Sequence, residues 1–278
     1  MSDLSLAPVP QTQHKAIVFE DVRVAFDNNV VLDGLSFDLL RGETKILLGI
    51  AGSGKSTILK LALGLIRPDR GRIFVLGHEV SAMREQDLFE IRRNIGMVFQ
   101  ESALFDSLTV RENVAYRLHE EADLPEDEIE RRVVQALRFV ELEHTLDMFP
   151  SELSGGMRRR VAIARAIVSQ PDVLLYDSPT GGLDPLTSTK IIELILKGRD
   201  QYHTSALMVT HRLPDAFLMA TNYYDVDAKE MRPMVGTAKT NIQTSVLILR
   251  DGRAIFDGTA MELSSAAERD PYIREYIR

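Results

Sequence analysis

The segment Gly49–Ser56 constrains the fold of this chain more than any other. It reads Gly-Ile-Ala-Gly-Ser-Gly-Lys-Ser and matches the pattern G-x-x-x-x-G-K-S/T. An apolar stretch at 45–48 precedes it, and an apolar-periodic stretch from Ile58 to Leu65 follows it. This order predicts a buried strand, a glycine-rich turn and a helix whose N-terminal N–H groups bind phosphate. The sequence therefore predicts a nucleotide triphosphate site.

Each position of this loop has an expected part in binding. Glycines let the backbone turn tightly and approach the phosphates. Lys55 brings a positive charge to the β- and γ-phosphate oxygens, and the Ser56 hydroxyl is expected to ligate Mg²⁺. The nucleotide-binding residues predicted here are Gly49, Ala51, Gly52, Ser53, Gly54, Lys55, Ser56 and Thr57.

Composition narrows the class of protein. Of 278 residues, 45% are hydrophobic, which is ordinary for a globular protein, and no apolar run approaches the roughly 18 residues of a membrane span. The net charge of −8 argues against nucleic acid as a partner. The absence of cysteine excludes disulfides, thiolate metal sites and thiol catalysis. We expect a cytoplasmic protein or one that is peripheral on a membrane.

Two further segments carry chemistry. The apolar stretch 173–176 ends in Asp177, which predicts a buried parallel strand that delivers this carboxylate to the carboxyl edge of a sheet. In P-loop proteins Mg²⁺ lies at that edge, so Asp177 is expected to bind the metal with Ser56. Upstream, Leu153–Met157 reads Leu-Ser-Gly-Gly-Met and precedes a helical pattern. A serine and two glycines at a helix N-terminus predict a second phosphate contact.

The order of these motifs resembles that of the ATP-binding subunits of ABC transporters. Leu153–Met157 is similar to the LSGGQ signature of that family, with Met in place of Gln. In the family, this loop closes over the γ-phosphate of ATP on the opposite subunit, so the resemblance implies a homodimer that sandwiches ATP and Mg²⁺. It also implies site residues: Ser154, Gly155, Gly156 and Asp184 at the nucleotide, Phe26 stacked on adenine, Gln100 at the metal and γ-phosphate, and His211 as the switch histidine.

The resemblance covers about residues 17 to 260 and implies the fold. It is an α/β P-loop NTPase fold: a RecA-like core with an antiparallel β-subdomain and an inserted α-helical subdomain. We expect the ATPase domain at 16–265, with the core at 16–99 and 171–265 and the helical subdomain at 100–170. Residues 1–15 and 266–278 are predicted to be terminal tails.

Two stretches, 99–110 and 150–157, give a finer resemblance to the Mla/Mce-type phospholipid transport ATPases. That resemblance implies a peripheral ATPase on the cytoplasmic face of the inner membrane. Its implied partners are a multi-pass permease of the MlaE type and, through the complex, an MCE-domain protein. Leu104 and Phe105 are candidate permease contacts, with ordinary core packing as the alternative. A transporter ATPase for another cargo also stays open.

Ser178 departs from the family pattern. In most members, a glutamate that polarises the attacking water follows the aspartate that corresponds to Asp177. A serine hydroxyl is not a general base at neutral pH, so the catalytic candidates are His211, Gln100 and Ser178 itself. Two interpretations stay open. One is a slow ATPase, which in the extreme case is an ATP-gated scaffold that dimerises with little turnover. The other is an ATPase in which His211 and the positioning of the reacting groups suffice for hydrolysis.

About twenty additional residues lie between Ala220 and Val246. The alternating apolar character at the ends of this segment predicts an added hairpin or an ordered loop. We favour a neutral surface insertion over a docking surface.

Overall fold

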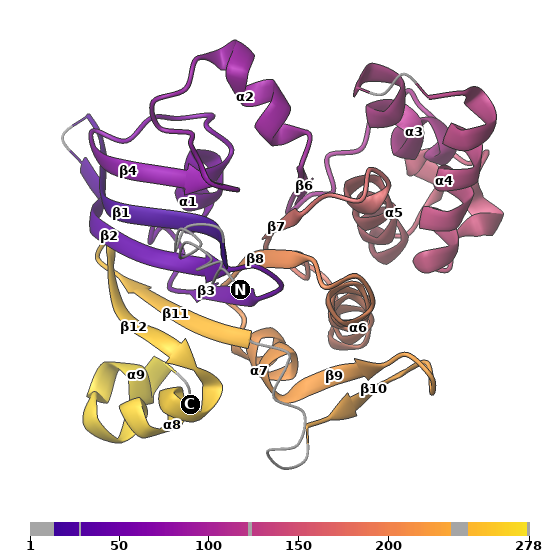
Figure 1. The fold of residues 1–278 in the computed structure, drawn as a ribbon. Coiled ribbons are helices and arrows are strands. Elements are labelled where there is room, and N and C mark those ends of the chain that lie inside the picture. The colour runs from indigo at the N-terminus through magenta and orange to yellow at the C-terminus, as the bar shows by residue number, and fades with distance from the viewer. Residues whose placement is uncertain (1–13, 28, 122–123, 235–243, 277–278) are drawn as a thin grey trace, which may run out of the picture.

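A six-stranded sheet forms the centre of the molecule (Figure 1). The structure, a computed structural model, describes residues 14–27, 29–121, 124–234 and 244–276. In spatial order the strands are β12 (Arg253–Thr259), β11 (Thr244–Arg250), β3 (Thr44–Leu48), β8 (Ser205–Thr210), β7 (Val173–Asp177) and β6 (Ile95–Val98). All pairs are parallel except β11 with β12. Every residue of β3 and β8 is buried, as expected for parallel strands that are covered on both faces.

Different layers cover the two faces of this sheet. Leu47 and Leu207 pack on one face with helix α1 (Lys55–Ala62) and with a second, antiparallel sheet. Ile46, which precedes Leu47, and Met208, which follows Leu207, point to the other face and pack with helices. This split follows from the alternation of side chains along a strand. The second sheet contains β2 (Asn29–Leu40), β1 (Lys15–Phe26), β4 (Arg70–Val75) and β5 (His78–Glu79).

Helices and short turns complete the layers. The helices are α2 (Glu85–Arg92), α3 (Val110–Glu121), α4 (Glu126–Phe139), α5 (Gly155–Ile167), α6 (Pro185–Tyr202), α7 (Leu213–Thr221), α8 (Ala260–Arg269) and α9 (Pro271–Tyr276), with 3-10 turns at Glu143–Thr145 and Pro150–Glu152. Helix α4 buries Ile129, Val133 and Leu137 on one face, as its pattern predicts. The predicted α/β architecture, with an antiparallel sheet and a group of helices beside the central sheet, is confirmed.

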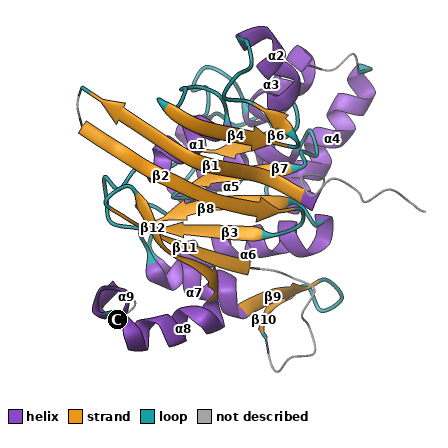
Figure 2. Cartoon of the chain, turned by 60° about the vertical axis from the view of Figure 1, so that its left-hand side comes forward, coloured by secondary structure: helices purple, strands orange, loops and turns teal. Residues whose placement is uncertain are grey.

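The predicted hairpin within the insertion is also confirmed. Strand β9 (Asn222–Asp225) pairs antiparallel with β10 (Glu230–Pro233), and the hairpin lies beside α6 and α7 (Figure 2). The Tyr224 N–H donates to the Asp200 carboxylate on α6 at 2.6 Å. Residues 235–243 of the insertion lie outside the described residues.

The two ends of the chain differ from the predicted tails. Residues 1–13 lie outside the described residues, and Lys15, assigned to the tail, begins β1. Residues 266–276 complete α8 and form α9 instead of a tail. The Thr259 and Glu262 side chains form a capping box that starts α8, and Ala267 and Ile273 pack into the core. In the described part of the chain, no helix combines the length and the apolar character that a membrane crossing needs.

Candidate functional site

Four predicted site segments leave the central sheet at the same edge. The loop Gly49–Ser56 follows β3, Asp177 ends β7, His211 follows β8, and Gln100 lies two residues beyond β6. The ends of these strands are level, because the paired residues include Leu48 with Thr210, Val209 with Asp177, and Tyr176 with Val98. The carboxyl edge of a parallel sheet is where α/β proteins bind ligands. The fold therefore gathers these predicted residues at one edge.

The glycines of the loop meet both a conformational and a steric demand. Gly52 and Gly54 have φ of +79° and +93°, and Gly54 is the residue that caps α1. A Cβ atom at Gly54 would lie 3.0 Å from Val31 and Leu32 of β2, and one at Gly49 would lie 2.6 Å from Ser53 Oγ. The resulting tight turn leads directly into the N-terminus of α1, an arrangement that suits phosphate.

Lys55 lies over this loop. Its Nζ atom donates to Gly49 O at 2.8 Å, to Ile50 O at 2.7 Å and to Ser53 Oγ at 3.3 Å. Burial lowers the pKa of Lys55, and the attraction of the Asp177 carboxylate acts in the opposite direction. The structure thus places the predicted phosphate-binding ammonium near the predicted metal-binding carboxylate.

The predicted metal ligands fit an ion that arrives with the nucleotide. Ser56 is exposed in the first turn of α1, Asp177 is half-buried, and Gln100 is exposed close to Gly181. No three His, Cys, Asp or Glu side chains gather into a metal site among the residues described. Mg²⁺ in ATPases is bound through few protein oxygens, one or two of them from carboxylates, and completes its shell with phosphate and water oxygens. A serine, a carboxylate and an amide can meet that need.

Ser178 sits in a tight turn directly after β7. It has a φ of +45° and is only 7% exposed. Its N–H donates to Val209 O at 2.9 Å, and its carbonyl accepts from the Gly181 N–H at 2.9 Å. The turn holds the backbone of Ser178 beside β8, which ends just before His211. The structure therefore brings Ser178 and His211 to the same corner of the edge.

Phe26 and the first loop residues are accessible. Phe26 ends β1 and is 49% exposed. It pairs with Asn29 of β2, and Val31, two residues further along β2, lies beside Gly54 of the P-loop. Ala51 is exposed in the turn, and Thr57 is half-buried in the first turn of α1. An exposed ring near the P-loop suits stacking on a base.

The signature segment starts α5. The Ser154 hydroxyl caps this helix by accepting from the Met157 N–H at 3.2 Å, while Gly155 is exposed. A Cβ atom at Gly156 would lie 2.6 Å from Thr187 Cγ2, so the first turn of α5 packs on that of α6. Helices α1 and α5 belong to the clusters on opposite faces of the sheet. One chain therefore keeps its two predicted phosphate-binding helix starts apart.

Asp184 has a local partner at the start of α6. Its carboxylate caps that helix by accepting from the Thr187 N–H at 3.0 Å. Hydrogen bonds from Thr187 lower the pKa of Asp184. Asp184 is exposed, so the cap leaves part of the carboxylate open to a neighbouring molecule.

Sequence reasoning missed three side chains that bind the loops of this edge. Arg159 and Arg212 donate to loop carbonyls, and the buried Asp215 carboxylate lies 3.5 Å from Arg212 Nε. The run of arginines at 158–160 is the only sequence signal for the first. Nothing in the sequence singles out the other two, because their role depends on which carbonyls the fold brings near them.

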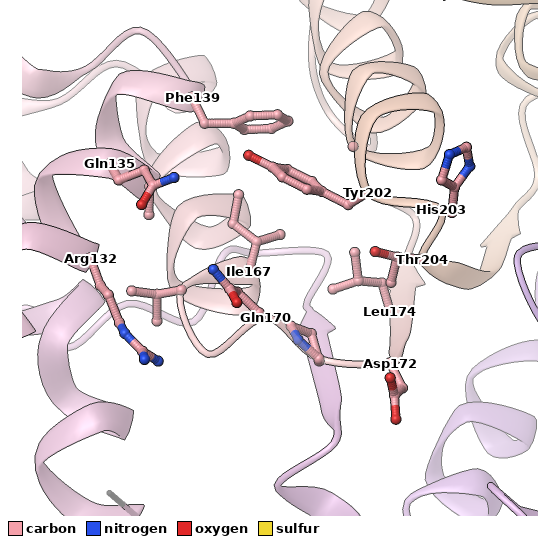
Figure 3. A pocket seen from close by; sticks show the side chains of 14 residues that line it. Arg132, Gln135, Phe139, Ile167, Gln170, Asp172, Leu174, Tyr202, His203 and Thr204 are labelled. Atoms are coloured by element: carbon pink, nitrogen blue, oxygen red, sulfur yellow. The ribbon is translucent and has the colours of Figure 1, made fainter. Parts of the chain in front are cut away.

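A cavity of about 320 Å³ lies at the opposite edge of the sheet. Its walls come from α4, from the ends of α5 and α6, and from the residues around the start of β7 (Figure 3). Gln135 and the Tyr202 hydroxyl turn toward each other across it (Figure 3). None of the predicted site residues lines this cavity. It is separate from the carboxyl-edge site.

Comparisons with known proteins agree with this geometry. Residues 32–181 match the family model described as "ABC transporter". The intermembrane phospholipid transport system ATP-binding protein MlaF of Escherichia coli K12 is 32% identical over 96% of this chain and 90% of its own length. The chloroplastic protein TRIGALACTOSYLDIACYLGLYCEROL 3 of Arabidopsis thaliana is 41% identical over 69% of this chain and 60% of its own length.

A solved structure gives the same result. The ATP-binding cassette MJ0796, in a dimeric post-hydrolysis state bound to ADP and Pi, superposes with a TM-score of 0.72 at 27% identity. The superposition covers 87% of this chain and 98% of that one. The predicted family resemblance is confirmed by the family model, by these relatives and by this structure. The chain therefore belongs to the ABC transporter family, of which it is an ATP-binding domain.

Proposed function

We propose that the chain hydrolyses ATP to energise a membrane transporter of phospholipids. The observation that carries this proposal is the similarity to MlaF, which extends over 96% of this chain and 90% of that protein. A likeness of that extent includes the segments around the nucleotide site as well as the fold. The name of MlaF places that protein in an intermembrane phospholipid transport system, and we assign the same class of cargo to the transporter that this chain energises.

The proposed active unit is a homodimer. One chain holds its P-loop helix and its signature helix on opposite faces of the sheet, whereas the MJ0796 cassette is dimeric with ADP and Pi bound. A second copy can bring Ser154, Gly155 and Gly156 to the γ-phosphate that Lys55 binds. Asp184, exposed at the start of α6, then faces the partner across the nucleotide.

In the proposed mechanism, the residues position ATP and neutralise its charge. Lys55 and the first N–H groups of α1 hold the β- and γ-phosphate oxygens. Ser56, Asp177 and Gln100 would hold Mg²⁺, which would supply positive charge to neutralise the phosphate oxygens, and Phe26 stacks on adenine. Water attacks the γ-phosphorus atom, the bond from that atom to the bridging oxygen of the β-phosphate breaks, the proton of the water passes to a γ-phosphate oxygen or to solvent, and ADP and phosphate leave. His211, and the Ser178 hydroxyl as a hydrogen-bonding group, orient the water.

A second candidate function is an ATP-gated scaffold that binds ATP and dimerises with little turnover. The observation that favours it is Ser178 at the position where most family members have a glutamate. Serine cannot accept the proton of the attacking water at neutral pH. The rate of ATP hydrolysis by the assembled complex separates the two functions.

We also propose where the membrane partner binds. Phe105 is 43% exposed, with its ring 4.7 Å from Tyr116, and it follows the Q-loop residue Gln100 by five positions. Leu104 packs against the core, so Phe105 is the better contact. The proposed partner is an MlaE-like permease linked to an MCE-domain protein, with this chain at the cytoplasmic face of the inner membrane. Residues 100–170 would then be the helical body that touches the permease, and 16–99 with 171–265 the core body.

Phospholipid movement by the assembled complex tests this function. Purified with its membrane partner and placed in vesicles, the complex is expected to move a fluorescent phospholipid only when ATP and Mg²⁺ are present. The variant Phe105→Glu puts a charge into the proposed apolar contact. We expect it to lose membrane association and lipid movement and to keep the wild-type affinity for ATP.

Phe217→Glu is the matched control, because Phe217 is an exposed phenylalanine on α7, away from the Q-loop. It should behave as wild type. Lipid movement that needs no ATP would contradict the proposed function. A Phe105→Glu chain that stays bound to the membrane partner would place the contact elsewhere.

A further inference from the structure

Arg159 joins three segments of the nucleotide edge. It lies in the second turn of the signature helix α5 and is 4% exposed. Its Nη1 atom donates to Phe99 O at 2.7 Å, next to Gln100, and its Nη2 atom donates to Gly181 O at 3.2 Å. One guanidinium thus ties the signature helix to the Q-loop and to the loop that follows Ser178.

Arg212 holds the same loop from the other side. It follows His211, and its Nη1 atom donates to Thr180 O at 3.2 Å, Leu183 O at 3.3 Å and Ser188 Oγ at 3.0 Å. Its Nε atom lies 3.5 Å from the Asp215 carboxylate. Asp215 is 2% exposed and accepts from the Thr180 hydroxyl, so this contact also links the two segments.

These contacts connect four segments of the proposed active site in one chain. The signature helix carries Ser154, the Q-loop carries Gln100, the next loop carries Ser178 and Asp184, and the switch segment carries His211. The planar guanidinium of an arginine presents its N–H donors in a rigid fork, whereas the three donors of a lysine ammonium converge on one rotatable nitrogen. The loop from Thr180 to Leu183 is the shared element, because both arginines donate to its carbonyls.

A contribution to folding stability is a weak explanation for a buried arginine at position 159. Burial lowers its pKa, opposed by the attraction of Glu101, and its buried Nε atom has no hydrogen-bond partner among the described residues. An unpaired buried donor costs free energy that offsets part of what the two hydrogen bonds contribute. The geometry of the two bonds, both to loops of the active site, points to a role in holding those loops.

We infer that Arg159 and Arg212 are positioning residues for ATP hydrolysis, which fix the loop after Ser178 relative to Gln100 and His211. The inference rests on the proposed ATPase function. Phosphoryl transfer depends mainly on positioning and charge stabilisation. Where a serine stands in place of the general base, the positions of the remaining groups determine the rate to a greater degree.

Three single variants test this role. Arg159→Gln and Arg212→Gln are each expected to lower kcat about ten- to hundredfold, the effect of a displacement of about 1 Å in an active site. The dissociation constant of ATP should change less than about twofold, because neither side chain touches the P-loop. Arg160→Gln is the matched control: it lies on the same helix and donates to a backbone carbonyl, Val140 O at 3.1 Å, far from the edge. It should retain wild-type kcat.

Hydrogen exchange measures the same coupling without turnover. The Ser102 N–H donates to Phe99 O, the Gly181 N–H to Ser178 O and the Leu183 N–H to Thr180 O. Arg159→Gln should speed exchange at Ser102 and Gly181, and Arg212→Gln at Gly181 and Leu183 but not at Ser102. The expected increase is about tenfold, since a hydrogen bond to a charged group contributes about 1.5 kcal/mol or more.

The outcomes separate this inference from the proposed function. Unchanged kcat and exchange in both variants would overturn the positioning role, as would a parallel loss of ATP binding and turnover. If the two variants exchange faster at the named amides but the wild type neither binds nor hydrolyses ATP, the ATPase function is rejected and the arginine links stay in place. Arg159→Lys keeps the charge but loses the planar fork that donates to both carbonyls, and it should give an intermediate kcat.

Discussion

Lys55→Ala is expected to abolish ATP turnover and to weaken ATP binding by about a hundredfold or more. The estimate corresponds to the loss of charge-assisted hydrogen bonds to two phosphates, each of about 1.5–3 kcal/mol. Lys55 is the only cation between Gly49 and Thr57. Its Nζ atom lies 2.7 to 2.8 Å from two carbonyls of the loop, near Asp177. Calorimetry with ATP, together with a steady-state ATPase assay, measures both effects.

Lys60→Ala is the control for this prediction. Lys60 is an exposed lysine in the last turn of the same helix, so its loss removes an equal charge without touching the loop. We expect wild-type affinity and turnover from it. Should Lys55→Ala bind and hydrolyse ATP normally, the phosphates lie elsewhere and the assignment of the loop is wrong.

Ser178→Glu is expected to raise ATP turnover by about 10²–10⁴-fold, the contribution of a positioned general base. Ser178 follows Asp177 directly, and its backbone is fixed by hydrogen bonds to Val209 and Gly181. A longer side chain with a carboxylate can reach the water that a hydroxyl only orients. The wild type is then correspondingly slow, and the ATP-bound closed dimer is its long-lived state.

Ser178→Gln controls for size, because glutamine has the shape of glutamate without its basicity. It should leave the rate close to that of wild type. If the site has instead adapted to serine, Ser178→Glu will gain little and His211→Ala will remove most of the activity. A wild-type kcat of about 10 s⁻¹, an ordinary value for an enzyme, that glutamate does not improve would refute the slow-site account.

Short-range patterns predicted the elements that carry the nucleotide site. The strand, turn and helix around Gly49–Ser56, the strand that ends at Asp177 and the hairpin in the insertion all follow from periodicity and turn residues close together in the sequence. Once the parallel strands were identified, the shared carboxyl edge followed as well. These predictions depend on neighbouring residues that restrict the local backbone conformation, so they could be made from this sequence without a structure.

The remaining features depend on contacts between distant segments. Arg159 reaches a carbonyl 60 residues away, and the Arg212 donor reaches one 32 residues away. The packing of Gly156 on Thr187 needs the arrangement of two helices, α5 and α6. The C-terminal helices were missed although Thr259 and Glu262 form a local capping signal, because the core partners of Ala267 and Ile273 exist only in the folded chain.

Disulfide cross-linking across the dimer tests the proposed composite site most directly. The chain has no cysteine, so Ser53→Cys in one chain and Ser154→Cys in a second, differently tagged chain give a single pair of thiols in the mixed complex. We predict a cross-link between the two tags that forms with ATP and is lost when the chain bearing Ser53→Cys also carries Lys55→Ala. The absence of a cross-link in ATP, or one that forms equally without nucleotide, would contradict a site shared between the P-loop of one copy and the signature of the other.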